Sequence, residues 1–596
     1  AMTYQVTINP GPTYSVEVRS PSSAPTNLTG TNLISPNIVD TPTFNLSAQG
    51  AQNFRDATLT GTSLLSPAVI RPYTPGDITM GRYGAVGMGS TAVDTQAWLD
   101  AWEDVIAADG GTITLPPGVF LIEEPFVSTT ALSDITRGVT VKGQGQRGTT
   151  IEQNAGLLAW NLPGSGTIRL EMSDLQILMA AGGNNGDIFS VSRGAVPGVR
   201  RGHDVLIDRV DVRPKDRTVD YANRVFAINK MYFPLVRQCQ ISGPYGPGVS
   251  TATQQQGTAA LDFDESYGPR AENCGIRSAA TGIRFVVESD PGGEGGTFFN
   301  NVIDAGTGIY MESAGQEPGG NIRGGHLNCA NMGIHLVNKL GCTIDDILFY
   351  NEEIAEGDED PTVGYLDINL DQCRDVVING NRFRYRIDPD RVNIDIGGNC
   401  NNIRMFGNYH SAGLYAVRVA AGAEKVYLLD PLLGTNIDQL LENAAGDEVT
   451  VRHMHPPRIT GRRTGVQTIS NATDTRVGFQ VYEQEVGNWS VSGPGNKFTV
   501  PTRQGVRHVR CTANIPWASN STGERALWVT VNGADVPGMA RITRSASGLS
   551  QLNITTGSIA VDGGDEIRFE VRQTSGADLD ITFGDDMWCE IVAVQV

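Results

Sequence analysis

Short apolar strands recur along the middle of the chain at intervals of roughly 25 to 32 residues. The recurring apolar positions are Ile283, Ile309, Ile334, Leu366 and Ile394. Second strands follow them at residues 300–303, 342–344, 373–378 and 400–405. Units this small cannot bury a core alone, so they must stack, with aliphatic and cysteine side chains in inward columns. Coils of about 25 residues suit a parallel β-helix with three sheets.

One stretch alone predicts a long helix. Trp98, Leu99, Trp102, Val105 and Ile106 fall on one helical face. Thr91 is the expected N-cap, with Asp94 as its capping-box partner, and Gly110-Gly111 should end the helix. Two short strands are expected around the Pro116-Pro117-Gly118 turn. A lone helix followed by strands suggests a cap on the end of the solenoid.

This segment resembles the entry motif of the pectate-lyase-like superfamily, the right-handed parallel β-helices. The matching residues are Tyr83-Gly84-Ala85, Gly87, Gly89, Asp94-Thr95 and Gly111-Thr112 through Gly118. Met88 stands where members usually have Asp, and the loop before the helix is one residue longer. The subgroup that it is most similar to is the phage tailspikes and polysaccharide depolymerases. The resemblance implies an all-β chain with a right-handed parallel β-helix over residues 79–435, the catalytic and polysaccharide-binding region.

Residues 1–78 contain an internal repeat, NLTGTNLISP at 27–36 and TLTGTSLLSP at 58–67. Neither copy can bury a core alone, so we expect burial against other chains, with a flexible linker as the alternative. The stretch resembles the slender trimeric necks of phage fibres. That resemblance implies a virion-proximal segment that joins the phage tail or baseplate.

Residues 466–596 show short alternating strands separated by Gly-rich turns, which predicts a separate β-sandwich after a linker at 436–465. The sandwich resembles the C1q/TNF-like jelly roll of phage and bacterial fibres. The matching residues are Asn496–Pro501, Gly505-Val506, Ala518–Gly523 and Gly564-Asp565-Glu566. The resemblance implies a homotrimer, with carbohydrate binding by this domain as a second interpretation.

Charge and composition disfavour several classes of partner. A formal net charge of −20 argues against nucleic acid and anionic membranes. No apolar run is long enough to span a membrane, and no secretory signal is expected. The eight cysteines form no C-x-x-C pair, so we expect buried thiols and no metal site. No cofactor is expected, although the acidic run at 356–360 could bind Ca²⁺ if it is not simply solvated.

Three strands end in a Glu-Ser pair at one-coil spacing, at Glu265, Glu288 and Glu312. Coils stack about 4.8 Å apart, so these glutamates could form a surface row at separations that bracket those of glycosidases. We predict Glu288 and Glu312 as the principal catalytic pair. Asp262, Asp264 and Glu265 are supporting candidates, and Arg284, Tyr310 and His335 are expected to bind sugar on the same face.

Three other interpretations of the carboxylates stay open. The row can be merely solvated, because repeats place surface acids in rows automatically. The site can instead lie at Asp345-Asp346 with Glu352-Glu353, or in a groove between subunits. His453-Met454-His455 has ligand-like spacing, but we expect it to be solvated.

The sequence therefore predicts a phage tailspike that cleaves a bacterial cell-surface polysaccharide by glycoside hydrolysis and acts outside the host as part of the virion. A non-catalytic receptor-binding fibre is one alternative. A polysaccharide lyase acting on an acidic glycan is the other.

Overall fold

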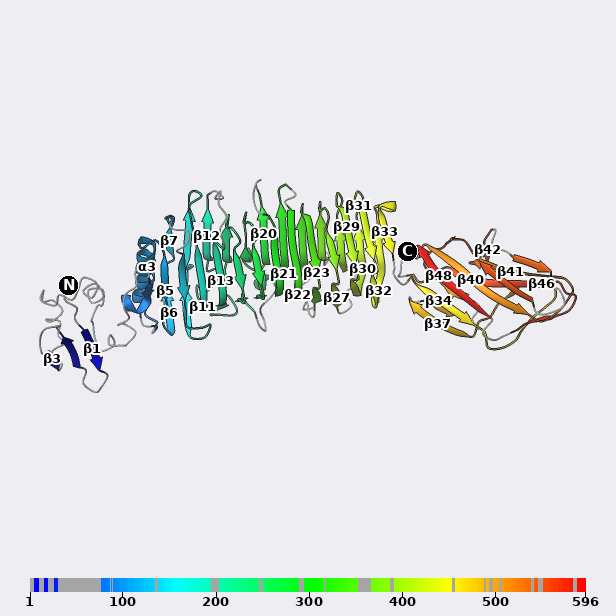
Figure 1. Cartoon of the computed structure of the whole chain (residues 1–596), viewed down its shortest axis with the longest axis horizontal. Coiled ribbons are helices and arrows are strands. Elements are labelled where there is room, and N and C mark those ends of the chain that lie inside the picture. The colour runs from blue at the N-terminus through cyan, green and yellow to red at the C-terminus, as the bar shows by residue number, and fades with distance from the viewer. Residues whose placement is uncertain are drawn as a thin grey trace. The chain divides into compact units, whose positions relative to one another are not determined.

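The computed structural model describes the backbone of residues 5–9, 15–19 and 26–29, and then residues 77–595 with gaps. The gaps are 86, 88, 134–137, 195–202, 246–248, 250, 289–293, 316–317, 352–365, 386–390, 453–455, 487–488, 493–496, 503–505, 538–540, 545–549 and 583–586. The chain divides into two compact units, residues 1–296 and 297–596. Figure 1 labels the helices and strands. Each unit is described by itself below.

The first unit begins with a small antiparallel sheet. Its strands are β1 (Gln5–Asn9), β2 (Ser15–Arg19) and β3 (Thr26–Thr29), in the order β1-β2-β3. Only the start of the first LTGT copy lies in β3, and the rest of both copies lies outside the described residues. The expectation that this segment packs against other chains therefore stays a prediction.

A short 3-10 helix η3 (Met80–Tyr83) precedes the one long helix of the described residues, α3 (Thr91–Ala107). The N-cap is Ser90 and not Thr91 as predicted. Asp94 accepts hydrogen bonds from the Ser90 and Leu121 backbone N–H groups, each at 3.0 Å. One carboxylate thus closes the first helical turn and ties the helix to the next strand. Trp98 and Trp102 are fully buried, so α3 covers the apolar end of the solenoid as expected.

Every solenoid strand of the first unit pairs in parallel with a strand one coil away. In the first unit the strands are β4 (Asp77–Thr79), β5 (Gly111–Thr114), β6 (Gly118–Ile122), β7 (Phe126–Ser128), β8 (Val139–Lys142), β9 (Thr149–Gln153), β10 (Leu158–Leu162), β11 (Leu170–Met179), β12 (Asp187–Arg193), β13 (Val205–Pro214), β14 (Arg224–Asn229), β15 (Leu235–Arg237), β16 (Gln240–Ser242), β17 (Ala259–Asp262), β18 (Arg270–Glu272), β19 (Gly275–Arg277) and β20 (Thr281–Val287), with a short helix α4 (Thr251–Gln254). Strand β14 pairs with β17, β15 with β18 and β16 with β19, so a coil contributes one strand to each of three sheets. This is the predicted three-sheet parallel β-helix.

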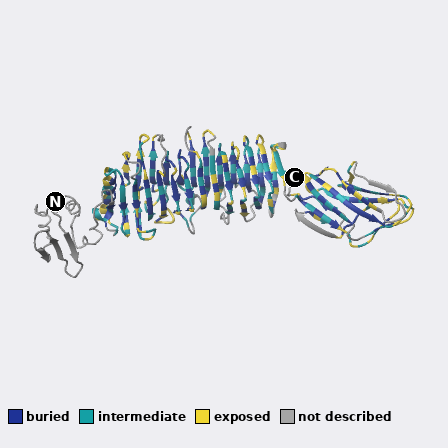
Figure 2. Cartoon of the chain, viewed as in Figure 1, coloured by how far each residue is buried: buried dark blue, intermediate teal, exposed yellow. Residues whose placement is uncertain are grey.

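The second unit contains further coils of the same kind. Its strands are β21 (Gly296–Ser313), β22 (Pro318–Val337), β23 (Leu340–Asp345), β24 (Leu348–Asn351), β25 (Leu366–Asp371), β26 (Val377–Asn379), β27 (Arg382–Tyr385), β28 (Val392–Ile396), β29 (Asn401–Phe406), β30 (Tyr409–Val419), β31 (Glu424–Leu429), β32 (Leu432–Asn443) and β33 (Val449–Arg452), with a 3-10 turn η4 (Gly446–Glu448). Figure 2 shows buried and less buried residues alternating along these strands, as inward columns require.

One column residue was predicted wrongly. Ile334 pairs with Ile368, and Ile368 pairs with Ile394. All three are fully buried, whereas Leu366 is partly exposed at the start of β25. Both Leu366 and Ile368 satisfy the two-residue alternation, and only the pairing register decides which of them enters the core.

The chain ends in an antiparallel β-sandwich, as predicted. Its strands are β34 (Arg458–Arg462), β35 (Gln467–Ile469), β36 (Thr475–Arg476), β37 (Val481–Val486), β38 (Ser490–Ser492), β39 (Lys497–Thr499), β40 (His508–Trp517), β41 (Glu524–Val531), β42 (Ala534–Asp535), β43 (Arg541–Arg544), β44 (Ser550–Thr555), β45 (Ile559–Ala560), β46 (Glu566–Gln573), β47 (Leu579–Ile581) and β48 (Trp588–Gln595). They form an eight-stranded and a seven-stranded sheet around one apolar core.

The predicted linker at 436–465 is corrected by the structure. Strand β33 pairs in parallel with β31 and so belongs to a solenoid coil. Strand β34 pairs antiparallel with β37 and β48 and so belongs to the sandwich. Local patterning could not make this assignment, because it is the pairing partners, β31 on one side and β37 with the distant β48 on the other, that separate the solenoid from the sandwich.

All eight cysteines are buried thiols, as expected of side chains stacked in apolar columns. Among the described helices, none is long and apolar enough to cross a membrane. The acidic run at 356–360, Glu352-Glu353 and the pair His453 and His455 lie outside the described residues.

Candidate active site

The candidate site lies on the outer face of one sheet of the first unit, formed by β12, β14, β17 and β20. The pairing register aligns Phe189, Phe226, Leu261 and Ile283 in one buried column. Because side chains alternate along a strand, the next residue of each strand points outward. Asp262 on β17 therefore pairs with Arg284 on β20 on the outer face.

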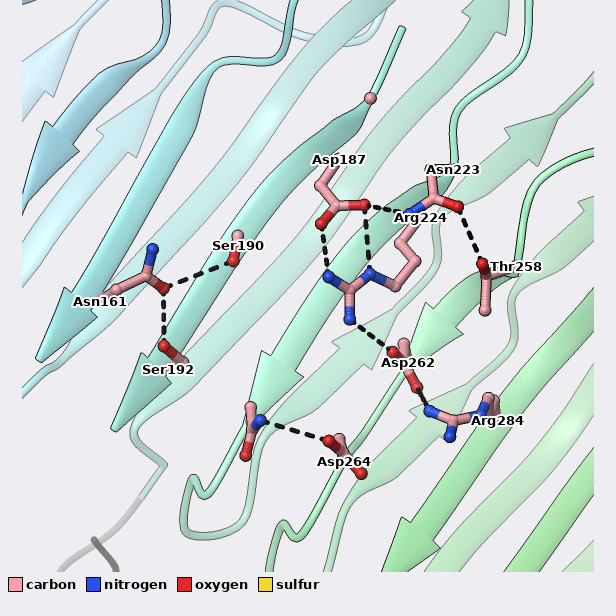
Figure 3. Close-up of polar contacts among 12 residues, drawn as sticks. Asn161, Asp187, Ser190, Ser192, Asn223, Arg224, Thr258, Asp262, Asp264 and Arg284 are labelled. Atoms are coloured by element: carbon pink, nitrogen blue, oxygen red, sulfur yellow. Dashed lines mark hydrogen bonds and ion pairs between the residues drawn. The ribbon is translucent and has the colours of Figure 1, made fainter. Parts of the chain in front are cut away.

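A chain of ion pairs crosses this face (Figure 3). The Arg224 Nε and Nη2 atoms donate to the two carboxylate oxygens of Asp187, at 3.1 and 2.5 Å. The Arg224 Nη1 atom donates to Asp262 Oδ2 at 3.0 Å, and Arg284 Nη1 donates to Asp262 Oδ1 at 2.8 Å. The Asp262 side chain is only 1% exposed, and both of its oxygens are held by guanidinium groups. Asp262 was predicted as a supporting catalytic residue, but its position is that of a structural anchor between three coils.

Asp264 has a different environment, two residues further along. Phe263 is fully buried, so Asp264 turns to the outer side, where it is half-buried. Asn229 Nδ2 donates to its Oδ2 at 3.3 Å. Its Oδ1 is buried without a hydrogen-bond partner among the described residues, and so is Oδ1 of Asn229. A buried oxygen without a partner disfavours the ionised form of Asp264, because its charge is not compensated by a hydrogen bond at that atom.

Burial raises the pKa of Asp264 from 3.8 to about 6. Its acidic neighbours Asp262, Glu288 and Glu265 act in the same direction, and the positive charge of Arg284 acts against them. A carboxyl group with this pKa is protonated in about a tenth of molecules at pH 7 and in about half at pH 6. That is the behaviour expected of a general acid near neutral pH.

Glu265 and Glu288 lie on neighbouring coils, as the predicted row requires. The Glu265 N–H donates to the Val286 carbonyl at 2.7 Å, which continues the ladder beyond β17. Glu265 has a φ of +50° and is buried, and its Oε1 accepts the Glu288 N–H at 3.2 Å. Glu288 itself is exposed directly after β20. Of the two, Glu288 is therefore the one whose carboxyl group solvent and substrate can reach.

Neutral polar side chains extend the same face. Ser190 and Ser192 donate to Asn161 Oδ1 at 3.5 and 2.6 Å. Asn223 donates to Asp187 at 2.9 Å, and Thr258 donates to Asn223 at 2.8 Å (Figure 3). Hydroxyl and amide groups arranged in this way match the hydrogen-bonding capacity of sugar hydroxyls.

Glu312, Tyr310 and His335 belong to the second unit, where they form a group of their own. The Tyr310 hydroxyl donates to Glu312 Oε2 at 2.5 Å. The rings of Tyr310 and His335 meet edge to face, 5.2 Å apart, and burial lowers the pKa of His335. The competing candidate Asp345 accepts a hydrogen bond from Asn379 at 2.9 Å and pairs with Arg323 at 3.4 Å.

Sequence reasoning missed Asp187, Arg224 and Asn229. Asp187 and Arg224 occupy matching positions at the starts of β12 and β14. Their opposite charges one coil apart were the available signal, but it becomes readable only once the register of the coils is known. Among the described residues no cluster of His, Cys, Asp and Glu has the geometry of a metal site.

No protein-family model and no curated protein matches the chain. Among solved structures, the A-module of the Azotobacter vinelandii mannuronan C-5 epimerase AlgE6 is similar at 17% identity and a TM-score of 0.46, over 63% of this chain and 98% of that one. The tailspike protein of an Acinetobacter phage is similar at 11% identity and a TM-score of 0.35, over 88% of each chain.

The tailspike protein of the Escherichia coli bacteriophage HK620 is similar at 11% identity and a TM-score of 0.36, over 83% of this chain and 93% of that one. Identities and TM-scores this low assign neither a substrate nor a reaction to this chain. The parallel β-helix is established by the strand pairing of the chain itself.

Proposed function

We propose that this protein is a glycoside hydrolase that cleaves a bacterial surface polysaccharide on the outer face of β12, β14, β17 and β20. One observation carries the proposal. A half-buried Asp264, with a pKa raised to about 6, lies on the coil next to the exposed Glu288. Glycoside hydrolysis needs one carboxyl group that gives a proton and a second one that is ionised.

Asp264 has the properties of the proton donor. Its O–H protonates the glycosidic oxygen as the bond from that oxygen to the anomeric carbon breaks. Glu288 then acts on the opposite side of the sugar, either as the base that removes a proton from the attacking water or as the nucleophile. One water molecule is consumed, and one new reducing end is formed for each bond cut.

The other carboxylates of the face have supporting roles. Asp262 fixes Arg224 and Arg284, because each of its oxygens accepts a hydrogen bond from one of them. Glu265 holds the backbone of Glu288. Glu312 with Tyr310 remains a candidate for a further sugar-binding or catalytic group of the second unit.

We further propose that the protein is a homotrimeric tailspike of a phage virion, joined to the tail through its N-terminal segment. The LTGT repeat and the resemblance of residues 466–596 to C1q/TNF-like jelly rolls support this assembly. Extracellular action on the host surface follows from such a location.

The test is cleavage of purified surface polysaccharides from strains on which the protein forms clearing haloes. New reducing ends indicate hydrolysis, whereas the ultraviolet absorbance of an unsaturated uronic acid indicates a lyase. Asp264→Asn and Glu288→Gln should each lower turnover by about 10²–10⁴-fold and leave binding intact.

Glu424→Gln is the matched control. Glu424 is exposed, and its carboxylate accepts a hydrogen bond from the Asn401 side chain in the second unit. Full activity of both site variants would place the chemistry elsewhere, and Glu312→Gln then tests the second unit. Binding without any cleavage by the wild-type protein would favour a receptor-binding fibre.

A further inference from the structure

Two arginines and a tyrosine meet at the turns that lead into the strands of the candidate face. The guanidinium carbons of Arg217 and Arg277 each lie 5.1 Å from the ring centroid of Tyr245. Arg217 belongs to the turn between β13 and β14, Tyr245 follows β16, and Arg277 ends β19, so the three residues come from successive coils. Both arginines are exposed. We call these three residues the arginine cluster.

Backbone hydrogen bonds between the coils hold the arginine cluster together. The Tyr245 N–H donates to the Arg217 carbonyl at 2.8 Å, and the Gly243 N–H donates to the Arg277 carbonyl at 2.8 Å. The backbone of all three residues is therefore ordered before any ligand arrives. A site of this kind loses less conformational entropy on binding than a flexible loop does.

Arg217 differs from the other cations of its turn. Arg213 pairs with Asp211 at 2.7 Å, and Lys215 pairs with Glu152. Among the described residues no carboxylate pairs with Arg217, and the contact described for its side chain is the tyrosine ring of the cluster. An aromatic ring compensates only a small part of the charge of an exposed cation.

The acids next to Arg217 are engaged by backbone groups. Asp220 is 1% exposed and accepts the N–H groups of Asp216 at 2.8 Å and of Gly182 at 2.7 Å. Asp216 accepts the Thr218 N–H at 2.9 Å. These bonds close the turn that carries Arg217, and they leave its guanidinium donors to an anion from outside the chain.

A small cavity beside the arginine cluster is a second indication of a ligand. Arg277 and Ser278 line it, and its volume of about 20 Å³ exceeds the roughly 10–15 Å³ that a water molecule needs. Ser278 is 6% exposed, and its hydroxyl is buried without a hydrogen-bond partner among the described residues. Because buried hydroxyls are normally hydrogen-bonded, we expect the cavity to hold a water molecule or one oxygen atom of a ligand.

The cavity lies at the start of two strands that also lead to the candidate active site. Val225 of β14 and Ala259 of β17 line the cavity. Asn229, at the end of β14, contacts Asp264, which follows β17. At about 3.3 Å per residue, the strand from Val225 to Asn229 spans about 13 Å. A polysaccharide that runs along these strands can contact both places.

We propose that the arginine cluster is a second glycan subsite, which binds an anionic substituent of the polysaccharide, either a sugar carboxylate or a phosphate. This inference rests on the polysaccharide binding of the proposed function and narrows the class of polymer. A guanidinium group can donate two parallel N–H bonds to either anion. The Ser278 hydroxyl completes the subsite through the water molecule of the cavity.

An array of bacterial capsular polysaccharides and O-antigens tests the inference with the full-length protein. Every polymer that the protein binds is compared with its carboxyl-reduced form and with a form from which hydrofluoric acid has removed phosphate. We expect the bound polymer to be anionic and one of the two treatments to weaken its binding. The effective treatment then distinguishes a carboxylate from a phosphate. Equal binding of all three forms overturns the inference.

A variant tests whether the arginine cluster causes this preference. Arg217→Gln should weaken binding of the anionic polymer by about three- to tenfold, because a charge-assisted hydrogen bond at an exposed site contributes modestly. It should leave binding of the treated, uncharged form as it is. Lys142→Gln is the matched control, because Lys142 is exposed at the end of β8 in the same unit, and it should change neither affinity. Equal losses from both variants would refute the subsite.

The same measurements separate the subsite from the proposed function. Binding that needs the anionic group and Arg217, without cleavage, supports the subsite and refutes the hydrolase. Cleavage of a polymer whose binding neither treatment nor Arg217→Gln changes refutes the subsite and keeps the hydrolase. Absence of binding to every polymer refutes both.

Discussion

Replacing Asp264 by Asn should stabilise the protein while it inactivates the site. The folded chain holds this carboxyl group at a pKa of about 6, against 3.8 for an unperturbed one. At about 1.4 kcal/mol for each pH unit, ionising Asp264 at neutral pH costs at most about 3 kcal/mol of folding free energy. Because the side chain is only half-buried, solvent screening reduces this to about 1–2 kcal/mol.

The sign of the effect fixes its pH dependence. The pKa of Asp264 is higher in the folded chain than in the unfolded one. The free energy of unfolding therefore has its full value below about pH 4, where Asp264 is protonated in both states, and decreases as the pH rises through about 6. Asn has no charge to bury and keeps the size of the side chain. The variant should therefore match the wild type at pH 4 and unfold about 2–4 °C higher at pH 8.

Thermal unfolding of both proteins at pH 4, 6 and 8, at one scan rate, measures this difference. Asp174→Asn is the control of opposite sign, because hydrogen bonds from Arg209 hold the pKa of Asp174 below its ordinary value. That variant should unfold at a lower temperature than the wild type at neutral pH and lose the difference in acid. A constant difference between Asp264→Asn and the wild type at every pH would refute the environment assigned to Asp264.

Four further outcomes are expected. The kcat/KM of the wild type should fall about tenfold for each pH unit above about 6, as Asp264 loses its proton, which a pH–rate profile with a neutral polymer measures. Asp262→Asn should destabilise the fold by about 1.5–3 kcal/mol, in contrast to Asp264→Asn, because Arg224 and Arg284 both lose their hydrogen bond to this buried carboxylate while Arg224 keeps Asp187; denaturant unfolding measures this. Ile334→Asp should abolish folding by placing a charge in a fully buried column, seen as loss of soluble protein, whereas Leu366→Asp should be milder because Leu366 is partly exposed. Sedimentation at micromolar concentration should show a trimer, and a monomer would refute the assembly.

The fold was predictable because its signals are local and repeated. One helix with a tryptophan face, followed by short apolar strands that recur at coil-like spacing, leaves few alternatives to a capped solenoid. The errors arose where a choice depended on distant pairing. Leu366 and Ile368 have the same strand parity, and pairing with Ile334 and Ile394 alone selects Ile368. Residues 449–462 were assigned to a linker because neither the partner β31 nor the partner β48 is visible in their own pattern.

The sequence predicted the carboxylates of the candidate site but not the role of each of them. A recurring carboxylate at one point of the coil predicted a row of glutamates, and Glu265 and Glu288 do lie on neighbouring coils. The roles depend on partners that come from other coils. Asp262 and Asp264 are two residues apart and of the same type, yet arginines from two neighbouring coils enclose the first.

The difference between these two aspartates also explains how one strand end can supply both rigidity and chemistry. Asp262 is fixed by guanidinium groups on both oxygens, so its coil cannot shift relative to its neighbours without breaking buried ion pairs. Among the described residues, Asp264 has an amide contact at 3.3 Å on one oxygen, and its other oxygen is buried without a hydrogen-bond partner. By fixing its coil, Asp262 keeps Asp264 in an environment that disfavours its charge and that a local rearrangement would otherwise relieve. A catalytic interpretation of Asp264 therefore depends on a structural interpretation of Asp262, and weakening the anchor should release the raised pKa of the acid as well as the fold around it.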